Sequence, residues 1–130
     1  MRPRKIRNLT SRRENCSDLR IPYTLESFDF RTDEGNEKFF DLNEIFGRQA
    51  PVVMEIGCGK GQFACEYAKR NPDNFYVAIE VVPDVIMLAM EKAKSQELKN
   101  VKFVCFDAND ICDVFRDDEL DGLYLNFSDP

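Results

Sequence analysis

From residue 51 onward, short runs of apolar residues alternate with segments whose apolar positions recur at helical spacing. The apolar runs predict strands at 52–56, 75–80, 101–106 and 120–127. The segments between them predict helices at about 61–70, at 84–94 and, for a short third helix, at 110–115. Strands that are apolar at nearly every position are typical of a sheet buried on both faces, and alternation with helices is typical of right-handed βαβ units. The pattern therefore predicts an α/β fold with a parallel sheet flanked by helices.

The first part of the chain has a different pattern. Residues 1–30 are charged and have no regular period, so we expect a basic N-terminal arm over 1–30 and the folded domain over 31–130. Within this domain a stripe of apolar residues predicts a first helix over 37–46, which Gly47 ends. Residues 1–20 carry a net charge of +5, in a chain whose net charge is −6. Such an arm can neutralise phosphates, although short basic tails are as often only solvated.

Three glycines follow the first predicted strand. Glycine accepts a positive φ and has no side chain, so Gly57, Gly59 and Gly61 let the backbone turn sharply into the next helix and pass close to a ligand. A tight turn without any ligand is the alternative interpretation of this spacing. Two acids favour a ligand, because Glu55 lies inside the apolar first strand and Glu80 ends the second strand, 23 residues after Gly57.

The two acids suit different parts of a nucleotide cofactor. A buried carboxylate is costly unless a partner compensates it. The amino group of S-adenosylmethionine would compensate Glu55, directly or through water, whereas a dinucleotide phosphate would be repelled. Glu80 can accept both hydroxyls of a ribose, the usual role of an acid about 20 residues after such a loop, and that role also fits a nicotinamide cofactor. Glu55 therefore favours S-adenosylmethionine over NAD, and Glu80 does not distinguish the two.

Polar residues also follow the third and fourth predicted strands. Asp107 offers an acceptor for the amino group of adenine, and helix capping by Asn109 or Asp110 is the alternative interpretation of this segment. The fourth strand ends in Asn-Phe-Ser-Asp-Pro. Its carboxyl end is expected beside the first strand, at the switch point where a transferred methyl group would lie. Asp129 is the acid that we expect to act there.

Composition narrows the chemistry and the class of protein. The chain contains no histidine, which excludes Ser-His and Cys-His pairs and the commonest general base. Its five cysteines have no C-x-x-C spacing, so we expect no zinc site, no other metal site and no disulfide framework. With 43% hydrophobic and 32% charged residues and no long apolar run, the chain is expected to be cytoplasmic, neither exported nor inserted in a membrane.

Four motifs together resemble those of the bacterial tRNA (guanine-N7-)-methyltransferases. They begin at Glu55 (EIGCGKGQF), Ala78 (AIE), Phe106 (FDA) and Leu123 (LYLNFSDP). The last motif is specific to that family, whereas the first occurs across methyltransferases. The likeness covers most of the chain, including the arginine-rich start, and implies the Rossmann-like fold of S-adenosylmethionine-dependent methyltransferases.

The resemblance also implies an activity and roles for particular residues. The activity is transfer of a methyl group from S-adenosylmethionine to N7 of a guanine in the variable loop of tRNA. The cofactor would be held by the glycine loop, Glu55, Glu80, Asp107 and Ala108, and Asp129 corresponds to the catalytic, guanine-contacting aspartate. Guanine N7 carries a lone pair and no proton, so its attack on the sulfonium methyl needs no general base. A chain without histidine suits this chemistry.

The chain departs from the family after Pro130, because in relatives the Ser-Asp-Pro motif continues into Trp-Pro, a basic run and the remaining strands of the sheet. We therefore expect the N-terminal part of a longer enzyme, truncated after the fourth strand. The alternatives are a cofactor-binding fragment without activity, a methyltransferase for a small molecule or a protein, and a non-catalytic nucleotide-binding or assembly module. Glu55 disfavours nicotinamide-dependent oxidoreduction, and the sequence does not indicate an oligomeric state.

Overall fold

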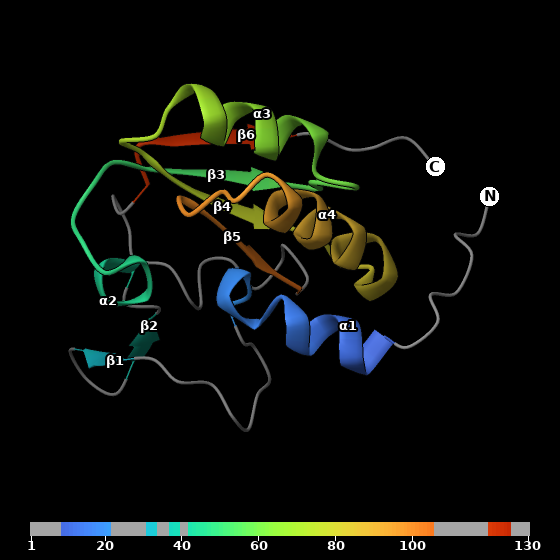
Figure 1. The fold of residues 1–130 in the computed structure, drawn as a ribbon. Coiled ribbons are helices and arrows are strands. Elements are labelled where there is room, and N and C mark those ends of the chain that lie inside the picture. Colours follow the sequence, from blue (N-terminus) through green and yellow to red (C-terminus); the bar gives the residue numbers. More distant parts are fainter. Residues whose placement is uncertain (1–8, 22–30, 34–36, 40–41, 106–119, 126–130) are drawn as a thin grey trace.

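The computed structural model describes residues 9–21, 31–33, 37–39, 42–105 and 120–125 of the 130-residue chain. Its main sheet contains four described strands, all parallel: β3 (Val52–Ile56), β4 (Phe75–Ile79), β5 (Val101–Val104) and β6 (Gly122–Leu125). They lie in the order β5-β4-β3-β6, so the chain moves outward from β3 to β5 and then returns to the other side of β3 (Figure 1). The carboxyl ends of β3 and β6 therefore flank a topological switch point, where open α/β sheets bind ligands.

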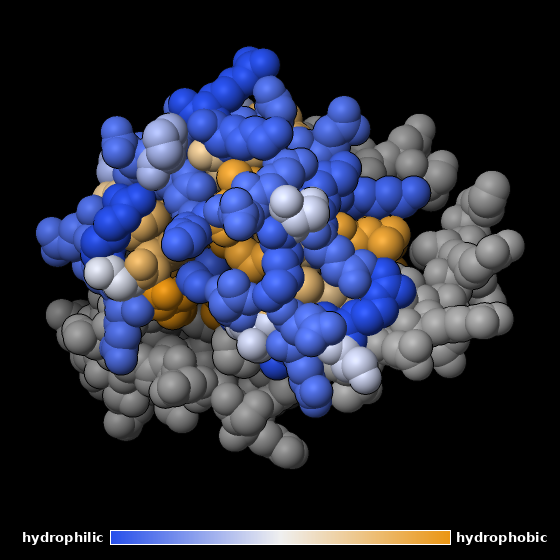
Figure 2. All heavy atoms as spheres, in the orientation of Figure 1, coloured by the Kyte–Doolittle hydropathy of each residue, from blue (hydrophilic) through white to orange (hydrophobic). Residues whose placement is uncertain are grey.

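The strands β3, β4 and β5 are buried on both faces, whereas Leu123, Tyr124 and Leu125 of β6 are exposed. In the described part of the chain the sheet is bordered by α2 (Leu42–Phe46), α3 (Gln62–Arg70) and α4 (Pro83–Ser95). Val53 and Tyr76 belong to the core cluster that contains residues of α3 and α4, whereas Met54 and Val77 belong to a second cluster that contains Leu42. On the side viewed in Figure 2, hydrophilic side chains cover most of the described surface, with apolar groups visible between them. No helix in the described part of the chain is long and apolar enough to cross a membrane.

The predicted α/β fold with a parallel sheet flanked by helices is confirmed, and one predicted helix is wrong in its first half. Residues Glu37–Phe39 form β2, which pairs antiparallel with β1 (Arg31–Asp33), and α2 begins only at Leu42. An apolar stripe over so few turns does not exclude a strand, and pairing with β1 satisfies backbone groups of β2. The short helix predicted over 110–115 lies outside the described residues.

Part of the predicted N-terminal arm is folded against the domain. Residues 9–21 contain α1 (Leu9–Asn15) and a short 3-10 helix, η1 (Ser17–Leu19). The chain then reaches the edge of the sheet, where Arg20 forms a parallel bridge with Phe103 and the Ile21 amide donates to the Phe103 carbonyl at 2.8 Å. The segment thus extends the sheet beside β5 over a single bridge.

An ion pair joins α1 to α4. The Arg12 guanidinium binds both oxygens of the Glu91 carboxylate, with Nε donating to Oε2 at 2.8 Å and Nη2 donating to Oε1. The same guanidinium lowers the pKa of Glu91 below its ordinary value. At least one arginine of the basic arm therefore has a structural contact, which the sequence analysis did not predict.

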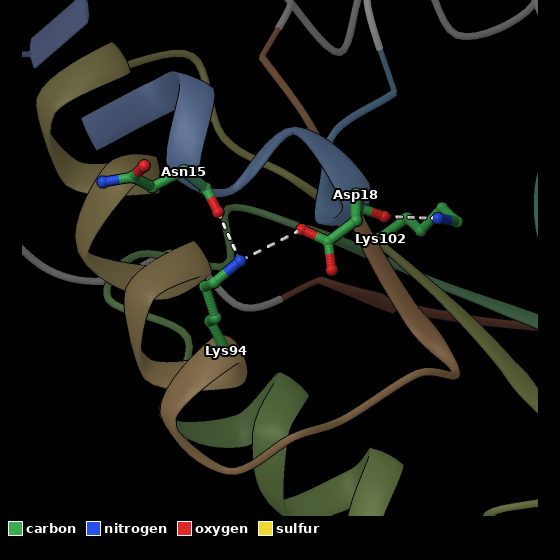
Figure 3. Close-up of polar contacts among 4 residues, drawn as sticks. All are labelled: Asn15, Asp18, Lys94 and Lys102. Carbon is green, nitrogen blue, oxygen red and sulfur yellow. Dashed lines mark hydrogen bonds and ion pairs between the residues drawn. The ribbon is translucent and has the colours of Figure 1, made fainter. Parts of the chain in front are cut away.

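Two lysines hold the end of this segment (Figure 3). Lys94 of α4 donates to the Asn15 carbonyl and lies 3.5 Å from a carboxylate oxygen of Asp18. Lys102 of β5 donates to the backbone carbonyl of Asp18. Partial burial lowers the pKa of the Lys102 amine. These contacts attach η1 to the last turn of α4 and to the sheet edge at the same time.

Replacement of Leu19 by alanine tests whether the segment is docked in this way. The Leu19 side chain is 3% exposed and belongs to the core under α3 and α4. We expect Leu19→Ala to lower the free energy of unfolding by about 2 to 4 kcal/mol, measured by urea denaturation. Ser17→Ala, at an exposed position of the same 3-10 helix, is the control and should change it by less than about 0.5 kcal/mol. Equal small effects from the two variants would contradict the docked position.

Candidate functional site

The three predicted glycines form the loop between β3 and α3. Gly57, Gly59 and Gly61 have φ values of 81°, 56° and 83°, a left-handed conformation that favours glycine. The amides of Gly57 and Cys58 both donate to the Ile79 carbonyl, at 2.8 and 2.9 Å. These bonds tie the start of the loop to the carboxyl end of β4. The predicted sharp turn between the first strand and its helix is therefore confirmed.

Gly61 also allows α4 to approach the loop. A Cβ atom at Gly61 would lie 2.7 Å from the Ala89 Cβ, closer than real Cβ atoms come, and 3.0 Å from the Ala89 Cα. Ala89 is itself fully buried on α4. The absence of a side chain at Gly61 thus determines how closely the start of α3 packs against α4.

Gly61→Ala should destabilise the protein through this contact. We expect a loss of about 2 to 4 kcal/mol in the free energy of unfolding, because the positive φ and the clash with Ala89 both penalise alanine. Gly47→Ala is the matched control, since Gly47 has a φ of 81° and, among the described residues, no neighbouring atom within 4 Å of the position that a Cβ would take. It should lose only about 1 to 2 kcal/mol. If thermal or urea unfolding gives the same loss for both variants, packing against Ala89 is not the constraint.

Glu80 holds the loop from the carboxyl end of β4. Its side chain is buried, with 8% exposed, and accepts the Gly59 amide on Oε1 at 3.0 Å and the Val82 amide on Oε2 at 3.2 Å. A carboxylate has about four acceptor positions, so these two bonds are compatible with further contacts to ribose hydroxyls. The sequence placed Glu80 correctly at the end of its strand but did not reveal that the carboxylate also organises the glycine loop.

Glu55 is buried inside the sheet. It is 1% exposed, and its Oε1 accepts a hydrogen bond of 2.9 Å from the Tyr76 hydroxyl on β4. Burial, followed by the negative charge of Glu55, raises the pKa of Tyr76 above its ordinary value, so that the hydroxyl keeps its proton. The sequence analysis missed Tyr76. The available signal was a tyrosine in an apolar strand, because a buried tyrosine hydroxyl usually needs a hydrogen-bond partner.

Both acids contribute to a negative potential at the loop. Burial raises the pKa of the Cys58 thiol, and the charges of Glu55 and Glu80 raise it further. Such a site favours a cationic ligand group and disfavours a phosphate placed against the same carboxylates. It holds no group of three or more metal-ligating side chains among the residues that the structure describes.

The remaining predicted site residues lie outside the described residues. Asp107 and Ala108 follow β5, and Asp129 follows β6. Because β3, β4, β5 and β6 are parallel, the carboxyl ends of all four strands lie at the same end of the sheet as the glycine loop. The roles predicted for Asp107, Ala108 and Asp129 remain predictions.

Comparison with known proteins identifies the family. A family model described as "Putative methyltransferase" matches residues 49–130. The chain belongs to this methyltransferase family. The match begins just before β3 and includes the glycine loop, Glu55 and Glu80. Family membership agrees with the predicted class of enzyme and not with a nicotinamide-dependent oxidoreductase.

Within this methyltransferase family, the chain matches the N-terminal part of tRNA (guanine-N7-)-methyltransferases. The Bacillus subtilis enzyme of this name is 47% identical over 88 residues, which are 68% of this chain and 41% of that protein. The Lachnoclostridium phytofermentans enzyme is 41% identical over 102 residues, 78% of this chain and 48% of that protein. The chain therefore spans somewhat less than half the length of these two curated relatives.

A solved structure supports the assignment of the methyltransferase fold. The 30S ribosomal A1408 methyltransferase from an uncultured bacterium superimposes with a TM-score of 0.54. It is 19% identical, and the match covers 65% of this chain and 41% of that chain. At this identity the likeness concerns the fold alone, a parallel sheet with flanking helices.

Proposed function

We propose that the protein acts in the transfer of a methyl group from S-adenosylmethionine to N7 of a guanine in the variable loop of tRNA. The observation that carries this proposal is the 47% identity to the tRNA (guanine-N(7)-)-methyltransferase of Bacillus subtilis over a region that includes the candidate site. A tRNA substrate would place the reaction in the cytoplasm, as the sequence predicts. Phosphate contacts by the basic residues of the N-terminal arm are part of the same proposal.

The described residues fit S-adenosylmethionine. The carboxylates of Glu55 and Glu80 are buried beside the glycine loop, and their negative charge suits a ligand that carries an ammonium and a sulfonium group. Glu55 would compensate the amino group of the methionine part, and Glu80 would accept the ribose hydroxyls while it keeps the Gly59 amide. Asp107 and Ala108 would contact the adenine. The cofactor supplies the methyl group, and the chain supplies the orientation of each of its parts.

The reaction needs alignment more than proton transfer. Guanine N7 attacks through a lone pair, so the protein must hold the base in line with the methyl group and the sulfur. Asp129 follows β6, and β6 is the neighbour of β3, the strand that leads into the glycine loop. Asp129 would hold the guanine edge and offset the positive charge that grows on the ring. The chain has no histidine, and this reaction requires none.

Calorimetry with S-adenosylmethionine and with NAD tests the choice of cofactor. We expect heat of binding with S-adenosylmethionine and none with NAD at the same concentrations, because the pyrophosphate of NAD would lie near Glu55. The variant Glu55→Gln should bind S-adenosylmethionine about tenfold more weakly, since it loses the charge that faces the amino group. Tight binding of NAD together with no response to S-adenosylmethionine would refute the proposal.

Replacement of Asp129 tests the substrate role. In the protein assayed on tRNA, Asp129→Ala should keep cofactor binding within twofold but lower 7-methylguanosine formation by about 10² to 10³. Asp73→Ala, an exposed aspartate in the turn before β4 and so at the opposite end of the sheet, is the control and should leave product formation unchanged. Near-normal product from Asp129→Ala would remove Asp129 from this role. Cofactor binding without any product from the unmodified chain would favour the alternative of a cofactor-binding part without activity.

A further inference from the structure

Tyr76 and Glu55 are brought together by the register of two neighbouring strands. Tyr76 of β4 is paired with Val53 of β3, and Ala78 is paired with Glu55. Side chains two residues apart on a strand point to the same face, so Tyr76 and Glu55 lie diagonally on the face under α3 and α4. The result is the 2.9 Å hydrogen bond from the Tyr76 hydroxyl to Glu55 Oε1.

Aromatic neighbours fix the Tyr76 ring in this position. The ring is fully buried, and its centroid lies 4.8 Å from that of Tyr67 and 6.4 Å from that of Phe63, both on α3. Phe63 in turn contacts Tyr124 of β6 edge to face, with centroids 5.0 Å apart. The tyrosine hydroxyl is therefore aimed at Glu55 by packing on α3, and the packing continues to the strand that precedes Asp129.

The chemistry of a tyrosine donor suits a carboxylate that must bind a cation. A lysine or arginine in place of Tyr76 would orient Glu55 but would also add a positive charge beside it. The tyrosine hydroxyl is neutral, and its raised pKa keeps the proton in place throughout the physiological range of pH. Tyr76 thus fixes one carboxylate oxygen without adding a charge that would oppose a ligand ammonium.

We propose that Tyr76 is a positioning residue, whose hydroxyl holds the Glu55 carboxylate in the orientation that receives the amino group of S-adenosylmethionine. This inference rests on the proposed function, because it concerns the same cofactor. Tyr76 acts on the amino-acid end of the ligand only through Glu55. Loss of the hydroxyl should therefore affect ligands that have this end and spare ligands that lack it.

Tyr76→Phe tests the proposal with two ligands, S-adenosylhomocysteine and 5′-methylthioadenosine, which share the nucleoside and the sulfur. Only the first has the amino-acid end. We expect the variant to weaken S-adenosylhomocysteine about tenfold and methylthioadenosine less than twofold, measured by calorimetry or by competition. The ratio of the two dissociation constants does not depend on the folded fraction, so partial misfolding does not imitate this result. Equal weakening of both ligands, or of neither, would overturn the proposal.

Tyr67→Phe is the matched control. It also removes one hydroxyl and one hydrogen bond, the 3.1 Å contact from the Asn74 amide, on the ring next to Tyr76. Its ratio of dissociation constants should equal that of the unmodified protein. A change of the ratio in Tyr67→Phe as large as in Tyr76→Phe would show that general loosening of the aromatic cluster, and not the bond to Glu55, is responsible.

A double-mutant cycle with Glu55→Gln supplies a second measurement on S-adenosylhomocysteine alone. If Tyr76 acts through the Glu55 carboxylate, Tyr76→Phe should weaken binding by less than twofold in the Glu55→Gln background. Additive losses would overturn the proposal. Its failure differs from that of the proposed function: an unmodified protein that binds S-adenosylhomocysteine, with Tyr76→Phe unchanged, overturns the role of Tyr76 alone. An unmodified protein that binds no S-adenosylhomocysteine overturns both.

Discussion

Burial of the Glu55 carboxylate inside a parallel sheet is costly unless other groups compensate it, and much of the candidate site is arranged around this constraint. The Tyr76 hydroxyl donates to it, and the aromatic side chains of α3 keep that hydroxyl in place. Burial raises the pKa values of Tyr76 and Cys58, and the same charge raises them further. A buried negative charge that raises the pKa of its neighbours is an unfavourable element of a core and a favourable element of a binding site for a cation.

Glu80, the second buried acid, stabilises the loop that contains the three glycines. Gly57, Gly59 and Gly61 allow the turn but do not by themselves select one conformation, because glycine has the largest backbone freedom. Glu80 and the Ile79 carbonyl restrict that freedom through hydrogen bonds to loop amides, and Ala89 restricts it through packing. The glycines therefore still let the loop backbone pass close to a ligand, while the hydrogen bonds and the packing hold the loop in one conformation.

The sequence predicts the parts of this structure that depend on local pattern. The four strands are apolar at nearly every position, and the positions of Glu55 inside the first strand and of Gly57 and Glu80 at strand ends follow from the strands alone. The strand β2 was missed because its pairing with β1 depends on contacts that apolar periodicity does not contain. The docking of α1 was missed because Arg12 and Glu91 are far apart in the chain. Tyr76 was missed because its partner is decided by the register of β3 and β4.

The bridge between Arg20 and Phe103 has a consequence for association between molecules. An exposed edge strand presents unpaired amides and carbonyls on which the strand of another molecule can add. At β5 the Phe103 carbonyl already accepts a hydrogen bond from the Ile21 amide, and the Lys102 amine donates to the backbone carbonyl of Asp18. The N-terminal segment therefore covers this edge at Phe103, and loss of residues 9–21 would leave the Phe103 carbonyl free to pair with a strand of another molecule.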